Sequence, residues 1–111
     1  MQGRGRLYGC PVELTLSLLG GKWKTVILSH LKQSPLRYAE LRSAIPGMSD
    51  KVLTQRLREL EKSGLVERST PGKGQARYRL TAYGRTFAPA LEALYNCGIH
   101  AAPEVDARFR R

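Results

Sequence analysis

The sequence has few cysteines and no long apolar run, and both absences exclude classes of protein. Its 2 cysteines, Cys10 and Cys97, are too few and too far apart for a disulfide framework or a cysteine-rich zinc site within one chain. No run approaches the roughly 18 apolar residues of a membrane-spanning helix. No apolar segment typical of a secretory signal follows Arg4 and Arg6. We therefore expect a protein that stays in the reducing cytoplasm.

Residue groupings that serve catalysis are also lacking. His30 and His100 are not grouped with Asp or Glu at the spacing of a metal site or a catalytic triad. No glycine-rich nucleotide loop and no paired carboxylates are evident. We expect no enzymatic activity, no cofactor and no metal, and we expect His30 on the surface or boundary of a helix.

Acidic residues are scarce as well. The chain has 9 Asp and Glu against 19 Lys and Arg, which gives a net charge of +10. This excess favours a polyanionic partner, either nucleic acid or an anionic membrane surface, and charge that only maintains solubility is the alternative. We expect one folded domain at residues 10–99, with flexible basic arms at 1–9 and 100–111.

Apolar spacing and turn residues predict a mainly helical first half. Pro11 suits the first turn of a helix that stops at Gly20-Gly21. Further helices are predicted at about 22–31 and 38–44, with a short extended piece at 36–37 between them.

The second half continues with a capped helix and a hairpin. Ser49 is a good N-cap and Gly64 a natural stop for a helix at about 50–63. Two strands are predicted at 66–69 and 76–80, joined by a glycine-rich polar turn. A last helix is expected from Thr81 to about Cys97, with a kink near Pro89.

The helix at 50–63 has two chemically different faces. Leu53, Leu57 and Leu60 cluster on one side of it. The opposite side is basic and hydrogen-bonding, and it carries Lys51, Thr54, Gln55, Arg58 and Lys62. Arg can pair with guanine, Gln with adenine and a Thr methyl with thymine, so these residues are candidates for DNA contact. An ordinary solvated helix face is the alternative.

The context of this helix favours DNA. A short helix, the Pro46-Gly47 turn and the capped helix match a helix-turn-helix, whose second helix enters the major groove. The following hairpin can form a wing over a phosphate or the minor groove through Arg68, Lys73 and Arg77. A plain hairpin is the alternative. The sequence therefore predicts a mainly α fold with a small β-hairpin wing, a winged helix-turn-helix.

An ordered series of motifs resembles the HxlR-type bacterial transcriptional regulators, relatives of the MarR-like winged helices. The resemblance covers about Cys10 to Gly98 and is carried by Cys10-Pro11, Gly20-Gly21-Lys22-Trp23, Leu41-Arg42, Leu53-Thr54-Gln55-Arg56-Leu57-Arg58-Glu59-Leu60, Gly64-Leu65-Val66-Glu67-Arg68 and Leu80-Thr81 with Gly84. The segment Pro71-Gly72-Lys73-Gly74 departs from the longer, proline-rich wing of many members, so Lys73 is a local inference.

The resemblance implies a homodimer whose terminal helices pair and set two recognition helices on an inverted repeat. The sequence agrees, because apolar faces are predicted on both terminal helices. We expect these faces to dimerise through Leu14, Leu18, Phe87, Leu91 and Leu94. The alternative is that both faces cover their own domain. Repression is the expected effect on transcription.

Some members of this family sense oxidants or electrophiles through a cysteine just before the first helix, and Cys10 occupies the matching position. The positive potential of a helix start favours the reactive thiolate. Oxidation could link Cys10 to Cys97 in a partner subunit. A small buried cysteine with no sensing role is the alternative.

Three further interpretations stay open at this stage. A basic protein that binds DNA or RNA regardless of sequence would need only the net charge. A winged helix that binds another protein would leave the cationic helix face unexplained. A small-molecule effector in the dimer cleft is also compatible with the sequence.

Overall fold

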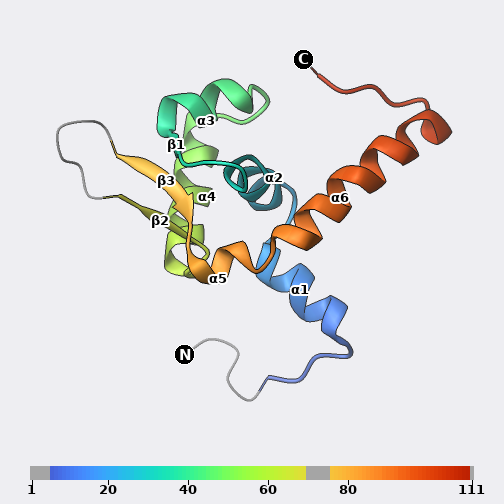
Figure 1. Ribbon diagram of the computed structural model, residues 1–111, viewed down its shortest axis with the longest axis horizontal. Coiled ribbons are helices and arrows are strands. Elements are labelled where there is room, and N and C mark those ends of the chain that lie inside the picture. Colours follow the sequence, from blue (N-terminus) through green and yellow to red (C-terminus); the bar gives the residue numbers. More distant parts are fainter. Residues whose placement is uncertain (1–5, 70–75, 111) are drawn as a thin grey trace.

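The computed structural model describes residues 6–69 and 76–110 of the chain. Within these ranges, helices surround one edge of a small sheet (Figure 1). In chain order the elements are α1 (Pro11–Leu19), α2 (Lys22–Leu31), β1 (Leu36–Arg37), α3 (Tyr38–Ala44), α4 (Asp50–Lys62), β2 (Val66–Arg68), β3 (Arg77–Leu80), α5 (Ala82–Arg85), α6 (Ala88–Ala101) and the 3-10 helix η1 (Ala102–Val105). None of the helices in these ranges is long and apolar enough to cross a membrane.

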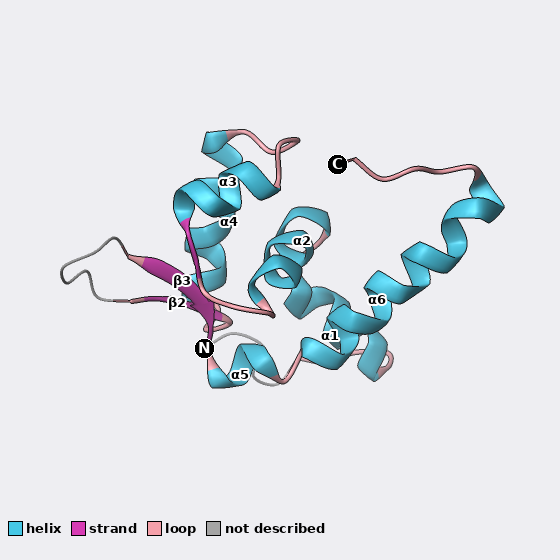
Figure 2. Cartoon of the chain, turned by 45° about the horizontal axis from the view of Figure 1, so that its top comes forward, coloured by secondary structure: helices cyan, strands magenta, loops and turns pink. Residues whose placement is uncertain are grey.

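The sheet has three antiparallel strands in the order β1-β3-β2. Leu36 of β1 is paired with Tyr78, and Val66 of β2 is paired with Leu80. The extended piece and the hairpin were both expected from the sequence, and the structure joins them into one sheet that projects from the helices (Figure 2). We call β2, β3 and the connection between them the wing.

The core lies between α2, α3, α4 and the sheet. Its fully buried side chains come from the apolar faces of these helices and include Ile27, Leu41, Leu53, Leu57 and Leu60. Burying one such side chain contributes roughly 1.5–3 kcal/mol relative to leaving it exposed. Because three leucines of α4 are committed to the core, the opposite face of that helix must point outward.

Local sequence signals set the end of α1 and the start of α4. Gly20 ends α1 with a φ of 78°, in the left-handed region that favours glycine. The hydroxyl of Ser49 accepts a hydrogen bond from the backbone N–H of Val52 at 3.2 Å, so Ser49 is the N-cap of α4 as predicted.

The expectation of one last helix with a kink near Pro89 is wrong. The structure has two helices, because α5 ends at Arg85 and α6 begins at Ala88. Pro89 lies in the first turn of α6, where its missing N–H costs no hydrogen bond, so it starts a helix and does not bend one. The helix also passes the expected end at Cys97 and continues to Ala101.

Two contacts hold α5 against the chain that follows α4. The Thr81 hydroxyl accepts from the N–H of Gly84 at 2.8 Å and donates to the carbonyl of Gly64 at 2.6 Å. Gly84 approaches Leu65 so closely that an added Cβ would collide with the Leu65 carbonyl oxygen. These contacts fix the direction in which the chain leaves the wing.

The ammonium group of Lys32 fastens α6 to the end of α2. It lies 3.6 Å from Oε1 of Glu92 and 5.7 Å from the ring centroid of Tyr95. Beyond this point α6 extends away from the body, and α1 lies beside its first turns (Figures 1 and 2).

Candidate nucleic-acid interface

The outward face of α4 carries the residues that the sequence singled out. Lys51, Gln55, Arg58 and Lys62 are exposed, and Thr54 is half-buried, whereas the leucines of the opposite face are at most 1% exposed. A hollow on this side is lined by Asp50, Lys51, Thr54, Gln55 and Arg58. We call Lys51, Thr54, Gln55, Arg58 and Lys62 the recognition face.

The first turn of α4 is tied to α3 by a cluster that sequence reasoning missed. The Tyr38 hydroxyl donates to Oδ1 of Asp50 at 3.0 Å and lies 3.3 Å from Oγ1 of Thr54. Nε of Arg42 donates to the same Asp50 oxygen at 2.7 Å. The bond from Arg42, and then the bond from Tyr38, lower the pKa of Asp50 below its ordinary value. The available signal was the spacing of Tyr38 and Arg42, one turn apart on a single helix face.

A second cluster braces α4 against α2. Nζ of Lys24 lies 3.2 Å from Oε1 of Glu59, and Nη1 of Arg56 lies 3.0 Å from the same oxygen. These cations lower the pKa of Glu59, and the hydrogen bond from Lys24 is the largest cause. The Glu59 carboxylate, at the margin of the recognition face, is therefore balanced by cations of the protein itself. Its repulsion of a polyanion is reduced accordingly.

The strands of the wing present two of the three predicted cations. Arg68 and Arg77 are exposed on neighbouring strands, and Ser69 closes the described end of the ladder by accepting from the N–H of Arg77 at 2.9 Å. Arg79 pairs with Glu67 across the strands at 2.7 Å, so its charge is balanced. Lys73 lies outside the described residues.

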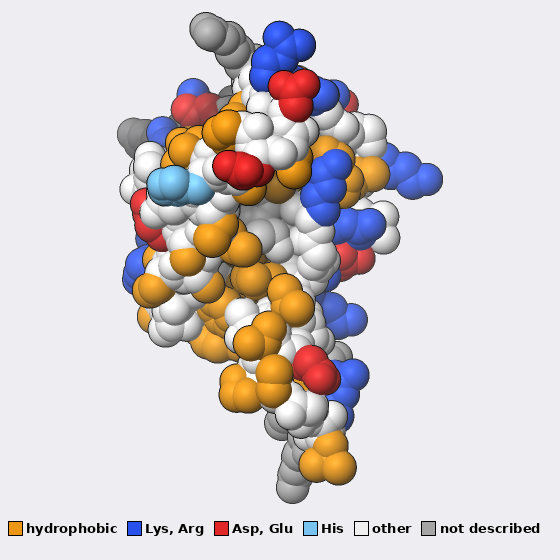
Figure 3. All heavy atoms as spheres, turned by 90° about the vertical axis from the view of Figure 1, so that its right-hand side faces the viewer, with side chains coloured by type: hydrophobic (Ala, Val, Ile, Leu, Met, Phe, Trp, Pro, Cys, Tyr) orange, Lys and Arg blue, Asp and Glu red, His pale blue; other side chains and the backbone are white. Residues whose placement is uncertain are grey.

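The terminal helices leave an apolar surface uncovered in the single chain. On α1, Leu14 is 38% exposed and Leu18 is 36% exposed; on α6, Leu94 is 48% exposed. Figure 3 shows hydrophobic side chains gathered over this side of the molecule. Further exposed large apolar residues of α1 and α6 are Val12, Leu16, Tyr95 and Ile99.

Two residues expected at the dimer contact pack in or against the core of the single chain. Leu91 is 1% exposed and belongs to the core, and Phe87 is partly buried against that core. The helix break before Ala88 turns Leu91 inward, so Leu91 has no surface to offer to a partner. The exposed apolar face of α6 begins at Leu94.

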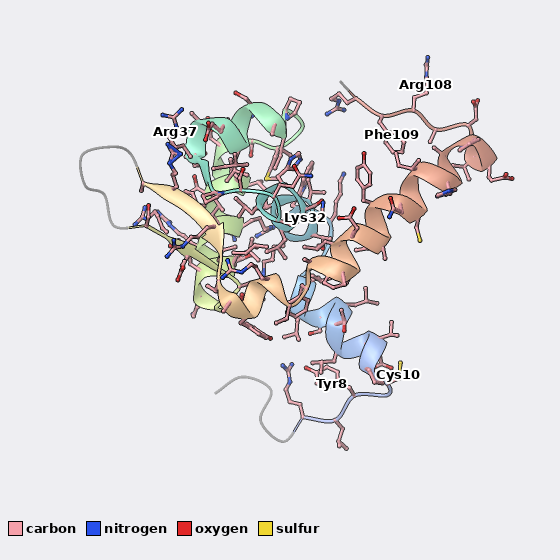
Figure 4. All side chains as sticks on the ribbon, viewed as in Figure 1. Tyr8, Cys10, Lys32, Arg37, Arg108 and Phe109 are labelled. Carbon is pink, nitrogen blue, oxygen red and sulfur yellow. The ribbon has the colours of Figure 1, made fainter. Side chains whose placement is uncertain are left out.

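Both cysteines are exposed. Cys10 is the residue before the first turn of α1, and its side chain makes no capping hydrogen bond (Figure 4). Cys97 lies on α6. Within the described part of the chain, no group of three or more His, Cys, Asp or Glu residues could hold a metal ion.

A helix pair with a tight turn, an outward polar second helix and an antiparallel wing define a winged helix-turn-helix, a class of DNA-binding domain. The model of the HxlR-like helix-turn-helix family matches residues 18–106, so the chain belongs to that family.

Known proteins resemble the chain over most of its length. YdeP, an HTH-type transcriptional regulator of Bacillus subtilis (strain 168), is 38% identical over 102 residues, which cover 88% of this chain and 78% of YdeP. The structure of the redox regulator HypR in its reduced form has a TM-score of 0.78 at 33% identity, and the match covers 89% of this chain and 100% of HypR. Quinone-bound YodB of B. subtilis has a TM-score of 0.67 at 33% identity, with 82% of this chain and 99% of YodB covered.

Proposed function

We propose that this protein is a sequence-specific transcriptional regulator that binds double-stranded operator DNA through α4. The observation that carries the proposal is the recognition face: cationic and amide side chains point outward from a helix whose leucines are locked in the core. Such a helix can enter the major groove without losing its anchorage.

The chemistry of each side chain suggests its role. Arg58 can donate two hydrogen bonds to guanine, Gln55 can pair with adenine, and the Thr54 methyl can contact thymine. Lys51 and Lys62 supply charge to phosphates. The wing residues Arg68, Lys73 and Arg77 complete the contact at a neighbouring phosphate or minor groove.

We further propose that two copies bind together through the exposed faces of α1 and α6. Residues such as Leu14, Leu18 and Leu94 are large and apolar, and a second copy of the same face would remove them from water. Two-fold pairing places the recognition helices on half-sites roughly one duplex turn, about 34 Å, apart. A dimer bound at such an inverted repeat within a promoter would block transcription, so we assign repression.

Selection of bound sequences from a random double-stranded DNA pool tests this function with the full chain. We expect enrichment of an imperfect inverted repeat with a half-site spacing of roughly one turn. A pool that remains random after several rounds, despite tight binding at low salt, would show a sequence-indifferent binder and overturn the proposal.

A redox response at Cys10 is the second proposed function. Its thiol is exposed at the start of α1, beside the face proposed for dimerisation. The similar HypR has been solved in oxidised and reduced forms. Peroxide would oxidise the Cys10 thiolate to a sulfenic acid, with the second peroxide oxygen leaving as water. The sulfenic acid would then condense with the thiol of the partner subunit's Cys97, forming a disulfide and releasing a second water.

DNA binding before and after treatment with hydrogen peroxide or a quinone tests this response. We expect the wild type to change its affinity and Cys10→Ser to be unresponsive. Cys97→Ser distinguishes the disulfide step, because that variant should still form the sulfenic acid but no inter-subunit bond. An equal response of wild type and Cys10→Ser would remove Cys10 as the sensor.

A further inference from the structure

The chain reverses direction after α6 and returns toward the body of the protein. Asp106 ends η1 with a φ of 54°, in the left-handed region, where Asp is among the better tolerated residues. The N–H of Ala107 donates to the carbonyl of Ala102 at 2.9 Å and closes the reversal. We call residues 106–110 the tail, and its course back from the outer end of α6 is visible in Figures 1 and 2.

The end of the tail lies beside the turn of the helix-turn-helix. Nη1 of Arg110 is 2.7 Å from the position that a Cβ on Gly47 would occupy. The same guanidinium lines a hollow with Trp23 of α2 and with Ile45 and Pro46, which follow α3. A residue near the end of the chain therefore sits next to the segment that links α3 to α4.

Lys22, Arg108 and Arg110 carry charge in this region that no described carboxylate balances, and of the three Arg110 lies directly beside the turn. Lys22 is exposed, with its ammonium group 4.3 Å from the ring centroid of Trp23. Arg108 and Arg110 are exposed, and Figure 4 shows Arg108 pointing away from the body. Among the ion pairs between described residues, none involves Lys22, Arg108 or Arg110. We call these three residues the tail cluster.

We propose that the tail cluster is a second contact to the sugar-phosphate backbone of the bound duplex, on the side of α4 opposite the wing. This inference rests on the proposed function. The turn before a recognition helix runs close to the DNA backbone, so the Arg110 guanidinium held beside it can reach a phosphate, and Lys22 and Arg108 add charge on the same flank. The strands β2 and β3 of the wing lie on one side of the helix pair, and the tail returns to the other (Figure 1). The duplex is thereby held at two flanks, with α4 between them.

A salt titration of DNA binding tests the cluster. Each phosphate contact contributes about 0.9 to the slope of log Kobs against log salt concentration. The double variant Arg108→Gln with Arg110→Gln should therefore reduce the slope by about 1.8, with an unchanged preferred sequence. The matched control is Arg6→Gln with Arg85→Gln, which removes the same charge from the N-terminal arm and α5 and should shift the slope much less. Sedimentation velocity on all three proteins verifies an equal oligomeric state.

The outcomes separate this inference from the function on which it rests. If the wild type prefers no sequence, the proposed function fails. If the wild type binds its selected operator and the tail variant keeps the wild-type slope, only the tail contact is overturned. Equal slope losses in the tail variant and the control would also overturn it, because general charge would then be the cause.

Discussion

Nε of Arg42 lies 2.7 Å from Oδ1 of Asp50, and this ion pair fastens α3 to the first turn of α4. The Tyr38 hydroxyl donates to the same carboxylate oxygen at 3.0 Å. Two side chains of α3 thus neutralise the one carboxylate that lines the hollow of the recognition face. They also fix the angle at which α4 leaves the turn, so they position the residues proposed to contact bases.

Removing this positioning should weaken DNA binding more than folding. We expect Tyr38→Phe to lower operator affinity several-fold and to relax the base preference opposite Thr54, because the hydroxyl no longer holds the Asp50 carboxylate. The free energy of unfolding should change little, since the hydrogen bond between Tyr38 and Asp50 is exposed to solvent. Anisotropy titrations and urea unfolding measure the two effects. Loss of stability without loss of base preference would contradict the positioning role.

The two cations Arg58 and Lys62 should differ in what they contribute. Arg58→Ala should cost about 1–3 kcal/mol on the selected operator and relax one base position, because a bidentate contact to a base is lost. Lys62→Ala should weaken every sequence by a similar factor, since it removes a phosphate contact. Competition binding against operators with single base changes measures both. If the two variants weaken all sequences alike, α4 does not select bases through Arg58.

The terminal helices offer a contrast between two neighbouring leucines. Leu94→Glu places a charge on the exposed face of α6, so we expect a folded protein that sediments as a monomer. Leu91→Ala removes a core side chain, so we expect a loss of about 2–5 kcal/mol in unfolding free energy. Sedimentation velocity and thermal unfolding distinguish them. A Leu94→Glu protein that sediments as the wild type would argue against dimerisation through this face.

Acid should destabilise the fold through its paired carboxylates. The pKa values of Asp50 and Glu59 are lowered in the folded chain, so both groups stay ionised longer there than in the unfolded chain. Their contribution is fully present above the ordinary carboxyl pKa of about 4 and is lost as the pH falls through the lowered values. The free energy of unfolding should therefore decline below about pH 4, and less steeply in a variant with Asp50→Asn and Glu59→Gln.

Glu104→Gln is the control for this pH experiment. Glu104 is exposed and takes part in none of the ion pairs between described residues. Its variant should follow the wild-type curve through the whole range. An unchanged curve for the double variant would show that neither pair contributes to acid stability.

The sequence predicted the elements whose signals are local. The capping of α4 by Ser49 and the spacing of Leu53, Leu57 and Leu60 lie within one segment, so the helix and its outward face could be inferred without tertiary information. The winged fold followed from the order of such segments. The recognition face also emerged from this helical periodicity alone.

What the sequence could not predict depends on contacts between distant segments. The split between α5 and α6 accompanies the close packing of Gly84 against Leu65, a contact between distant segments, and Leu91 lies in the core. Helical periodicity alone assigned Leu91 and Leu94 to the same apolar face, because both follow the apolar spacing of one segment. The bonds of Tyr38 and Arg42 to Asp50 likewise cross a turn, so the spacing of these two residues could place them on one helix face but could not identify Asp50 as their partner.

The hydrogen bonds of Thr81 suggest how a dimer could respond to a signal. The Thr81 hydroxyl joins Gly64, two residues beyond the end of α4, to the first turn of α5, so the end of α4 and the short helix that leads into α6 are held at one point. A tilt of α6 that moved α5 would therefore be passed on to the end of α4. Each copy would keep its contacts with its own half-site, while the distance between the two recognition helices of the dimer would change. The signal would then alter the preferred spacing between the two half-sites more than the affinity for either half-site.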